Sequence, residues 1–147
     1  MKKILSVFLT VVFASCAVMA QSENDRNLGT WNEQGISHYR FNLFVGCFCP
    51  FGQDMPLIIE VKDELIVSME YTSGNPIDAS NTEYFRRFAT IDRLFTEVEN
   101  LVNGEADEVI VTYDPTYGFP TQISIDYIKN AVDDELSLTV SDFEPLP

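Results

Sequence analysis

Two cysteines separated by one residue, Cys47 and Cys49, are the side chains of this sequence whose type and spacing best suit chemistry. In an extended strand, residues two apart lie roughly 6.5 Å apart, whereas a disulfide needs Cβ atoms about 3.8 Å apart. A Cys47–Cys49 bond therefore requires the chain to bend. Gly46 and Pro50 flank the pair, and these residue types permit a bend and end a strand.

Three interpretations of the cysteine pair compete. The favoured one is a structural disulfide that fixes the loop of residues 48–56, because disulfides of exported proteins usually serve structure. The alternative is thiol–disulfide exchange. A bond that closes so short a ring adds little stability from loop entropy and can store strain, which are features of a disulfide that is easily reduced. Only Arg40 is a nearby cation in the sequence, amid many carboxylates that raise a thiol pKa. Metal binding is weakest, because two cysteines and His38 fall short of four ligands, so we expect no metal site and no cofactor.

Other candidates for catalysis are few. His38 is the sole histidine, and its polar neighbours in the alternating pattern predict a place on the solvated face of a strand. The acidic runs at residues 105–108 and 133–135 lack the ligand spacing of a calcium loop. We therefore expect no catalytic residue and a protein that is not an enzyme, with weak cation binding as a third hypothesis.

One loop has the composition of a recognition element. Prolines stiffen it and aromatic side chains accompany them, in the series Tyr113, Asp114, Pro115, Tyr117, Gly118, Phe119 and Pro120. The favoured interpretation is that the rings cap the end of the sheet, because buried aromatic residues dominate small cores. Recognition of a partner is the alternative, and it requires Tyr117 and Phe119 to be exposed.

The first twenty residues have the features of a signal peptide. Lys2 and Lys3 precede an apolar run that ends in a small-x-small pattern at Ala20, which predicts a mature chain starting at Gln21. A minority interpretation is a lipobox that ends at Cys16 and gives a lipid anchor. The apolar run is shorter than the ~20 residues of a membrane helix, and no second run follows. We expect an exported protein, periplasmic or extracellular, with residues 21–147 as a single domain.

The charge of the chain limits its partners. The sequence has 9 basic and 23 acidic residues and a net charge of −14. Removal of residues 1–20 takes two lysines away and brings the charge to −16. Such a field repels phosphate and keeps a protein soluble. We therefore expect no nucleic-acid partner.

Alternating apolar residues predict six strands. The alternating positions are Tyr39, Phe41, Leu43, Val45 and Cys47; Leu57, Ile59 and Val61; Leu65, Val67, Met69 and Tyr71; Val109, Val111 and Tyr113; Ile123, Ile125 and Tyr127; and Leu136, Leu138 and Val140. Asp63 and Glu64 predict a tight hairpin between the second and third strands.

Helical patterns are fewer. Thr90 is a predicted N-cap, one apolar stripe runs from Ile91 to Val102, and Asn103-Gly104 predicts the end. Residues 28–35 predict one or two helical turns, and residues 72–89 predict a long surface loop. We expect an α+β fold: one twisted antiparallel sheet in the order three strands, helix, three strands, with the main amphipathic helix on one face and a short N-terminal helical segment.

Several of these residues together carry a resemblance to a known family. They are Trp31, Gly35-Ile36, Tyr39, Cys47-Phe48-Cys49-Pro50, Thr90-Ile91-Asp92, Leu94-Phe95, Tyr113-Asp114-Pro115 and Gly118-Phe119-Pro120. The chain resembles the bacterial secreted proteins and lipoproteins of domain-of-unknown-function family 6174 over nearly all of residues 21–147. The resemblance implies an exported α+β domain and brings no established activity, cofactor or catalytic residue. Asp63-Glu64 stands where we expect a glycine in the first hairpin, which leaves the turn type open.

By elimination, the sequence favours a non-enzymatic binding or envelope-interaction module with an unknown protein partner. The expected contact surface is the free face of the sheet or the aromatic loop of residues 113–120. A thiol–disulfide redox protein that uses Cys47 and Cys49 is the alternative function.

Overall fold

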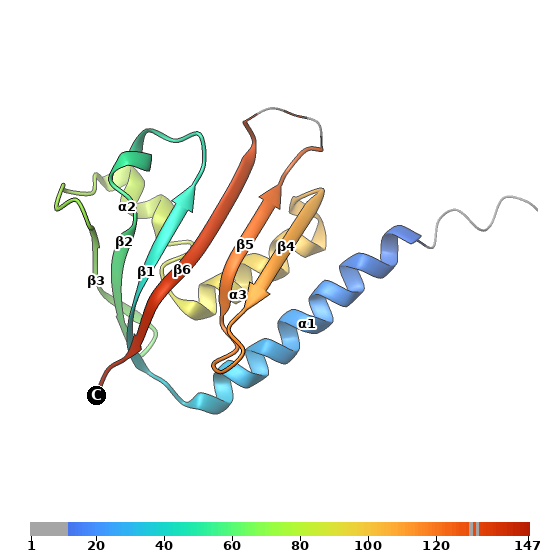
Figure 1. The fold of residues 1–147 in the computed structure, drawn as a ribbon, viewed down its shortest axis with the longest axis horizontal. Helices are drawn as coiled ribbons and strands as arrows, with labels where there is room; N and C mark the ends of the chain where they lie inside the picture. Colours follow the sequence, from blue (N-terminus) through green and yellow to red (C-terminus); the bar gives the residue numbers. More distant parts are fainter. Residues whose placement is uncertain (1–11, 130, 132) are drawn as a thin grey trace, which may run out of the picture.

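The computed structural model describes residues 12–129, 131 and 133–147 (Figure 1). The helical elements of these residues are α1 (Val12–Gln34), η1 (Pro50–Gln53), α2 (Ala79–Phe85), α3 (Ile91–Asn100) and η2 (Leu101–Glu105). The strands are β1 (His38–Gly46), β2 (Leu57–Lys62), β3 (Leu65–Tyr71), β4 (Glu108–Tyr113), β5 (Pro120–Asp126) and β6 (Glu135–Pro145).

Within the described residues, the strands form one six-stranded antiparallel sheet in the order β3-β2-β1-β6-β5-β4. Helices α1 and α3 lie on one face of it, and no helix of the described residues lies on the other face, which we call the helix-free face (Figure 1). The predicted α+β class and antiparallel sheet are confirmed. The predicted order is wrong in detail, because α2 and α3 both lie between β3 and β4 and α1 is long.

Strand β1 shows why the helices cover one face. Its residues Tyr39, Phe41, Leu43 and Val45 are buried, and the residues between them are half-buried or exposed. Successive side chains of a strand point to opposite faces, so one face of β1 is apolar and must be covered. Helix α3 supplies the cover with its own buried stripe, which includes Leu94 and Val98.

The hairpin between β2 and β3 has the predicted two-residue turn. Lys62 pairs with Leu65, and Asp63 and Glu64 between them have φ angles of 50° and 65°. Positive φ at both central residues is the mark of a type I′ turn, whose twist matches the twist of paired strands. The turn therefore forms without the expected glycine.

A β-bulge follows this turn and changes which residues of β3 face the core. Val61 pairs with Ile66 and Glu60 pairs with Ser68, so Val67 has no partner on β2. Ile66 packs against the core, while Leu65 and Val67 are 70% and 57% exposed. The predicted alternation through Leu65 and Val67 is wrong, because one extra residue in a strand reverses the faces on its two sides.

Helix α1 is longer than the predicted one or two turns. It ends where predicted, since Gly35 has a φ of 62° and directly follows Gln34. Residues 1–11 of the predicted signal peptide lie outside the described residues, and the backbone of Cys16 lies within α1. In the described part of the chain, no helix combines the length and apolar character needed to cross a membrane.

The prediction of a surface loop at residues 72–89 is wrong for its second half, which contains helix α2 and buried residues. Asp78 caps α2, because its carboxylate accepts a hydrogen bond of 2.8 Å from the main-chain N–H of Asn81. Phe85, Phe88 and Ala89 are fully buried. A helix of seven residues is too short to show a helical period, so the sequence pattern does not reveal it.

Helix α3 begins as predicted. The Thr90 hydroxyl accepts a hydrogen bond of 3.2 Å from the main-chain N–H of Arg93. The main-chain N–H of Ile91 donates to the hydroxyl of Tyr39 at 3.0 Å, which joins the first turn of α3 to β1. Burial raises the pKa of Tyr39 above its ordinary value.

Candidate functional site

A hollow of about 740 Å³ lies beside β3, at the edge of the sheet. We call it the β3 groove. It is lined by residues 64–70 of the hairpin and β3, by residues 74–77 of the following loop, and by Thr82, Arg86 and Arg93.

The β3 groove combines an apolar wall with an open main chain. Ile66, Met69 and Ile77 line it and pack against the hydrophobic core. On the side away from β2, β3 pairs with no strand of the described residues. Alternate residues of an edge strand direct their N–H and C=O groups outward, so the groove offers main-chain donors and acceptors beside apolar side chains.

Two arginines form the charged part of the groove. Arg86 is the C-cap of α2, and Arg93 lies in the first turn of α3. The guanidinium of Arg93 donates a hydrogen bond to the main-chain oxygen of Arg86, which holds the two residues together. Both are exposed, and neither pairs with a carboxylate in the described part of the chain.

Their neighbour Arg87 is differently placed. Its guanidinium contacts the carboxylate of the buried Glu97 at 2.7 Å and lies 5.3 Å from the centre of the Phe88 ring. The sequence analysis did not predict the β3 groove or its arginines. The available signal was three arginines within residues 86–93 of a strongly acidic chain.

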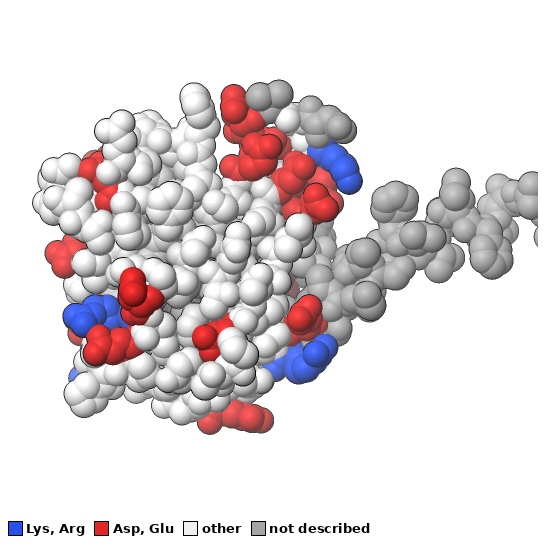
Figure 2. All heavy atoms as spheres, in the orientation of Figure 1, with Lys and Arg blue, Asp and Glu red and all other residues white. Residues whose placement is uncertain are grey.

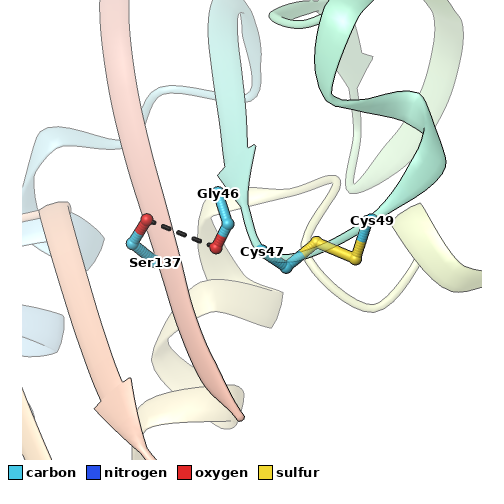
Figure 3. Close-up of a disulfide and its surroundings, with 4 residues drawn as sticks. All are labelled: Gly46, Cys47, Cys49 and Ser137. Atoms are coloured by element: carbon cyan, nitrogen blue, oxygen red, sulfur yellow. Dashed lines mark hydrogen bonds between the residues drawn. A yellow bond between two sulfur atoms is a disulfide. The ribbon is translucent and has the colours of Figure 1, made fainter. Parts of the chain in front are cut away.

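The cysteine pair forms a disulfide, a bond that the structural interpretation and the thiol–disulfide exchange interpretation both include (Figure 3). The Cα atoms of Cys47 and Cys49 are 5.2 Å apart. Strand β1 ends at Gly46, and the main-chain N–H of Cys49 donates to the oxygen of Cys47 at 2.8 Å. This tight turn leaves Phe48 at its tip, 87% exposed.

Gly46 serves a different purpose from the predicted one. A Cβ atom at this position would collide with the hydroxyl of Ser137 on the neighbouring strand β6. That hydroxyl donates to the main-chain oxygen of Gly46 at 3.4 Å (Figure 3). The absence of a side chain therefore allows close strand packing, and the chain bends after Gly46. Thiol–disulfide exchange by the pair stays a prediction.

Acidic side chains gather at one end of the helix-free face (Figure 2). Burial, and then the charges of Asp134, Glu135, Glu108 and Asp107, raise the pKa of Asp126 above its ordinary value. Among the side chains that the structure describes, no group of three or more His, Cys, Asp or Glu residues has a metal-binding arrangement. The structure therefore adds no support to the cation-binding hypothesis.

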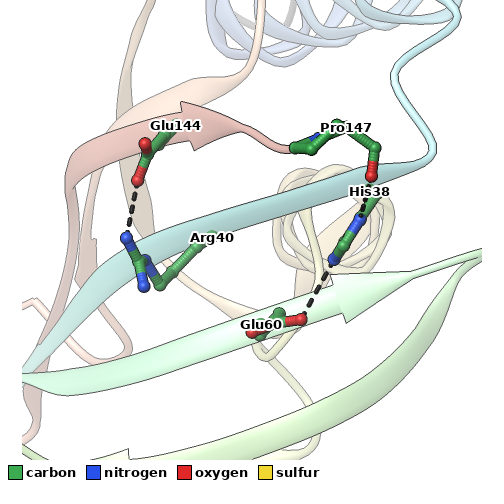
Figure 4. A network of polar contacts seen from close by, with 5 residues as sticks. All are labelled: His38, Arg40, Glu60, Glu144 and Pro147. Atoms are coloured by element: carbon green, nitrogen blue, oxygen red, sulfur yellow. Dashed lines mark hydrogen bonds and ion pairs between the residues drawn. The ribbon is translucent and has the colours of Figure 1, made fainter.

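His38 lies on the helix-free side of β1, with two hydrogen-bond partners (Figure 4). Its Nδ1 is 2.9 Å from the main-chain oxygen of Pro147, and its Nε2 is 3.0 Å from Oε1 of Glu60. Beside it, Arg40 and Glu144 form an ion pair of 2.7 Å. The predicted solvated histidine is thus partly buried and links β1 to β2 and to the C-terminal residue.

The contacts of His38 predict a pH-dependent stability. A neutral imidazole carries one N–H and can donate to only one of these two oxygens, whereas the charged imidazolium donates to both. The hydrogen bonds to Glu60 and, to a smaller extent, to the main-chain oxygen of Pro147 therefore raise the pKa of His38 above 6.5. The stability from these bonds is present below pH 6.5 and is lost as the pH rises through the raised pKa. We expect an NMR titration of His38 to show the raised pKa and Glu60→Gln to lower it.

Glu144→Gln is the matched control for this titration. It removes a carboxylate that pairs with Arg40 and makes no hydrogen bond with His38. We expect it to leave the pKa of His38 close to the wild-type value. An unshifted His38 in the wild type would contradict the prediction.

The loop of residues 113–120 is a tight, internally bonded turn. The carboxylate of Asp114 accepts from the main-chain N–H groups of Thr116 at 2.8 Å and Tyr117 at 2.7 Å. The N–H of Asp114 donates to the oxygen of Phe119 at 2.8 Å, and that of Gly118 donates to the oxygen of Asp114 at 2.9 Å. These bonds fix the turn between β4 and β5.

The aromatic rings of this loop turn inward. Phe119 is 3% exposed and lies edge-on to Trp31 at 6.2 Å, and Tyr117 is half-buried with its ring 5.1 Å from that of Phe143. Recognition of a partner by this loop requires both rings to be exposed, and Phe119 does not meet this requirement. Pro115 remains exposed at the outer edge of the loop.

Comparison with known protein families gives a match over most of the chain. A family model with the description "Family of unknown function (DUF6174)" matches residues 23–145, which is most of the 147-residue chain. No curated protein and no solved structure matches the chain. The resemblance drawn from the sequence motifs is thereby confirmed at the level of the family.

Proposed function

Since the chain belongs to DUF6174, a family of unknown function, we propose that it is a non-enzymatic binding module that holds an extended segment of a partner protein along β3. The observation that carries this proposal is the open edge of β3 beside the β3 groove. An added strand takes its affinity from main-chain hydrogen bonds and its specificity from pockets for alternate side chains.

The exposed residues of β3 support this use. Edge strands are usually protected because open edges invite pairing with other chains. Here Leu65 and Val67 are largely exposed on such an edge. The bulge at Val67 interrupts regular pairing, so we place the main-chain contacts at residues 68–71 and the side-chain contacts near Leu65 and Val67.

Two other surfaces were expected to make the contact. The helix-free face is largely uncharged (Figure 2), with Phe44 43% exposed. In the loop of residues 113–120, Phe119 is buried and Tyr113 and Tyr117 are half-buried. We favour the β3 groove because it alone of these surfaces joins unpaired main-chain groups, apolar side chains and cations in the described residues.

The location of the module belongs to the same proposal. We place it outside the cytoplasm, in the periplasm or the extracellular space, with residues 1–20 as its signal peptide. A lipid anchor at Cys16 is the alternative. The disulfide between Cys47 and Cys49 supports this location, because disulfides persist in oxidising compartments.

Selection of phage-displayed random dodecapeptides on the immobilised protein tests the binding function. We expect the selected peptides to be rich in β-branched residues. Each of the variants Val67→Lys and Leu65→Lys should weaken the binding of these peptides by about tenfold, because a lysine on an edge strand opposes strand addition. Ile110→Lys is the matched control, because Ile110 is 60% exposed on β4 at the other edge of the sheet. Absence of enriched peptides, or binding that responds only to Ile110→Lys, would overturn the proposal.

A further inference from the structure

We infer that the segment held in the β3 groove carries a carboxylate, which binds between the guanidinium groups of Arg86 and Arg93. This inference rests on the proposed function and adds the chemical class of the ligand. It follows from the position, the free hydrogen-bonding capacity and the surroundings of these two side chains.

Both guanidinium groups can receive an anion. Arg86 and Arg93 line the β3 groove and also a second hollow of about 460 Å³, so they lie between the two. Arg87, Glu83 and Glu97 also line the second hollow, so the acidic side chains of that hollow lie on the side of the arginines away from β3. An arginine has five N–H donors in a fixed fork that matches a carboxylate. Arg93 uses part of its fork on the main-chain oxygen of Arg86, which fixes its position and leaves further donors.

The surroundings of these arginines favour an anion that the protein does not supply. The net charge of the chain is −14, yet the ion pairs of the described residues join Glu60 to His38, Glu144 to Arg40 and Glu97 to Arg87, and none includes Arg86 or Arg93. Charge complementarity therefore points to a negative group on the ligand. The acidic remainder of the protein repels long polyanions such as nucleic acid, which favours a peptide with an isolated carboxylate.

The groove also limits where that carboxylate lies along the ligand. Glu64 and Glu70 line the same groove near the two ends of β3 and repel a second negative charge. The acid must therefore stand at an internal position of the bound segment, with apolar or β-branched neighbours beside Ile66, Met69 and Ile77. A segment with several consecutive acidic residues fits poorly.

The test uses the peptides selected on wild-type protein. We expect an Asp or Glu at one internal position of the enriched sequences. A synthetic selected peptide with that acid changed to the amide should bind the wild-type protein about tenfold more weakly, since hydrogen bonds to a charged group are stronger than those to a neutral one. The affinity of the acidic peptide should fall with added salt, and the affinity of the amide peptide should change little.

Variants of the protein provide the second readout. The double variant Arg86→Gln/Arg93→Gln should bind acid and amide peptides equally. Arg26→Gln/Lys129→Gln is the matched control, because it removes the same charge from exposed side chains outside the groove. It should retain the preference for the acid. The peptide comparison on wild-type protein does not depend on the folding of any variant.

The outcomes separate the inference from the proposed function. Equal binding of acid and amide peptides by wild-type protein, with continued sensitivity to Val67→Lys, would overturn the carboxylate and keep strand addition. An acid preference that persists in Arg86→Gln/Arg93→Gln would also overturn the inference. Failure to select any peptide would overturn both.

Discussion

Replacing Trp31 with alanine is expected to lower the free energy of unfolding by about 3–5 kcal/mol, the range for a buried aromatic residue of this size. Trp31 is 4% exposed and joins α1 to the sheet. Its ring lies edge-on to Tyr39 at 5.4 Å, to Phe119 at 6.2 Å and to Phe143 at 5.8 Å. The substitution leaves a cavity where α1, β1, β6 and the loop of residues 113–120 meet.

Urea denaturation followed by circular dichroism measures this loss, because the variant lacks the only tryptophan and gives no matching fluorescence signal. Glu33→Ala is the matched control on an exposed position of α1, and it should change stability by less than about 0.5 kcal/mol. A Trp31→Ala variant within about 1 kcal/mol of wild type would show that α1 does not contribute to the cooperative unit.

Trp31 shares the anchoring of α1 with a buried polar residue. Asn24 is 3% exposed and donates a hydrogen bond to the main-chain oxygen of Phe95 in α3 at 3.2 Å. Its side-chain oxygen accepts from the hydroxyl of Tyr113 in β4 at 3.0 Å. Burial raises the pKa of Tyr113, so this hydroxyl remains a donor across the ordinary pH range. Apolar and polar anchors thus hold α1 at separate points.

Replacing Gly118 with alanine is expected to cost roughly 2–4 kcal/mol, although it adds one methyl group. Gly118 has a φ of 83°, which an alanine adopts only with strain. The added Cβ would also lie 2.6 Å from the main-chain oxygen of Asn27 and 2.9 Å from the Cβ of Thr30. Both neighbours belong to α1, so the loop must move away from the helix.

Gly29→Ala is a matched control of opposite sign. Gly29 lies within α1, and a Cβ there meets no atom within 4 Å. Alanine is favoured over glycine in a helix by about 0.5–1 kcal/mol, so this variant should be slightly more stable than wild type. Urea denaturation of the two variants compares the same chemical change in two places. Equal stability of both would contradict the predicted contact between the loop and α1.

The local patterns of the sequence predicted much of the fold. The alternation from Tyr39 to Val45 identified β1, and the Thr90 cap with its apolar stripe identified α3. Cys47 and Cys49 are close enough in sequence for their bond to depend on a single turn. Each of these features depends on residues that are close together in the sequence, so a local sequence pattern can predict it.

Other features depend on contacts that no local pattern contains. Helix α2 has seven residues and is held by the burial of Phe85. In the part of α1 whose side chains are described, the buried Trp31 and Asn24 anchor the helix. The bulge at Val67 shifts the faces of β3 without changing the alternation of the sequence. These elements are stabilised by distant partners, so their limits appear only in the folded chain.

The β3 groove is one of the features that depend on contacts between residues distant in the sequence. Arg86 is the C-cap of α2 and Arg93 lies in α3, and β3 precedes both across residues that the sequence pattern predicted to be a surface loop. The sequence by itself determined the charge of these residues and the existence of the strand. Only the tertiary structure, by placing α2 and α3 beside the unpaired edge of β3, brought them together. Long-range packing decides such proximity, and local propensity has no information about it.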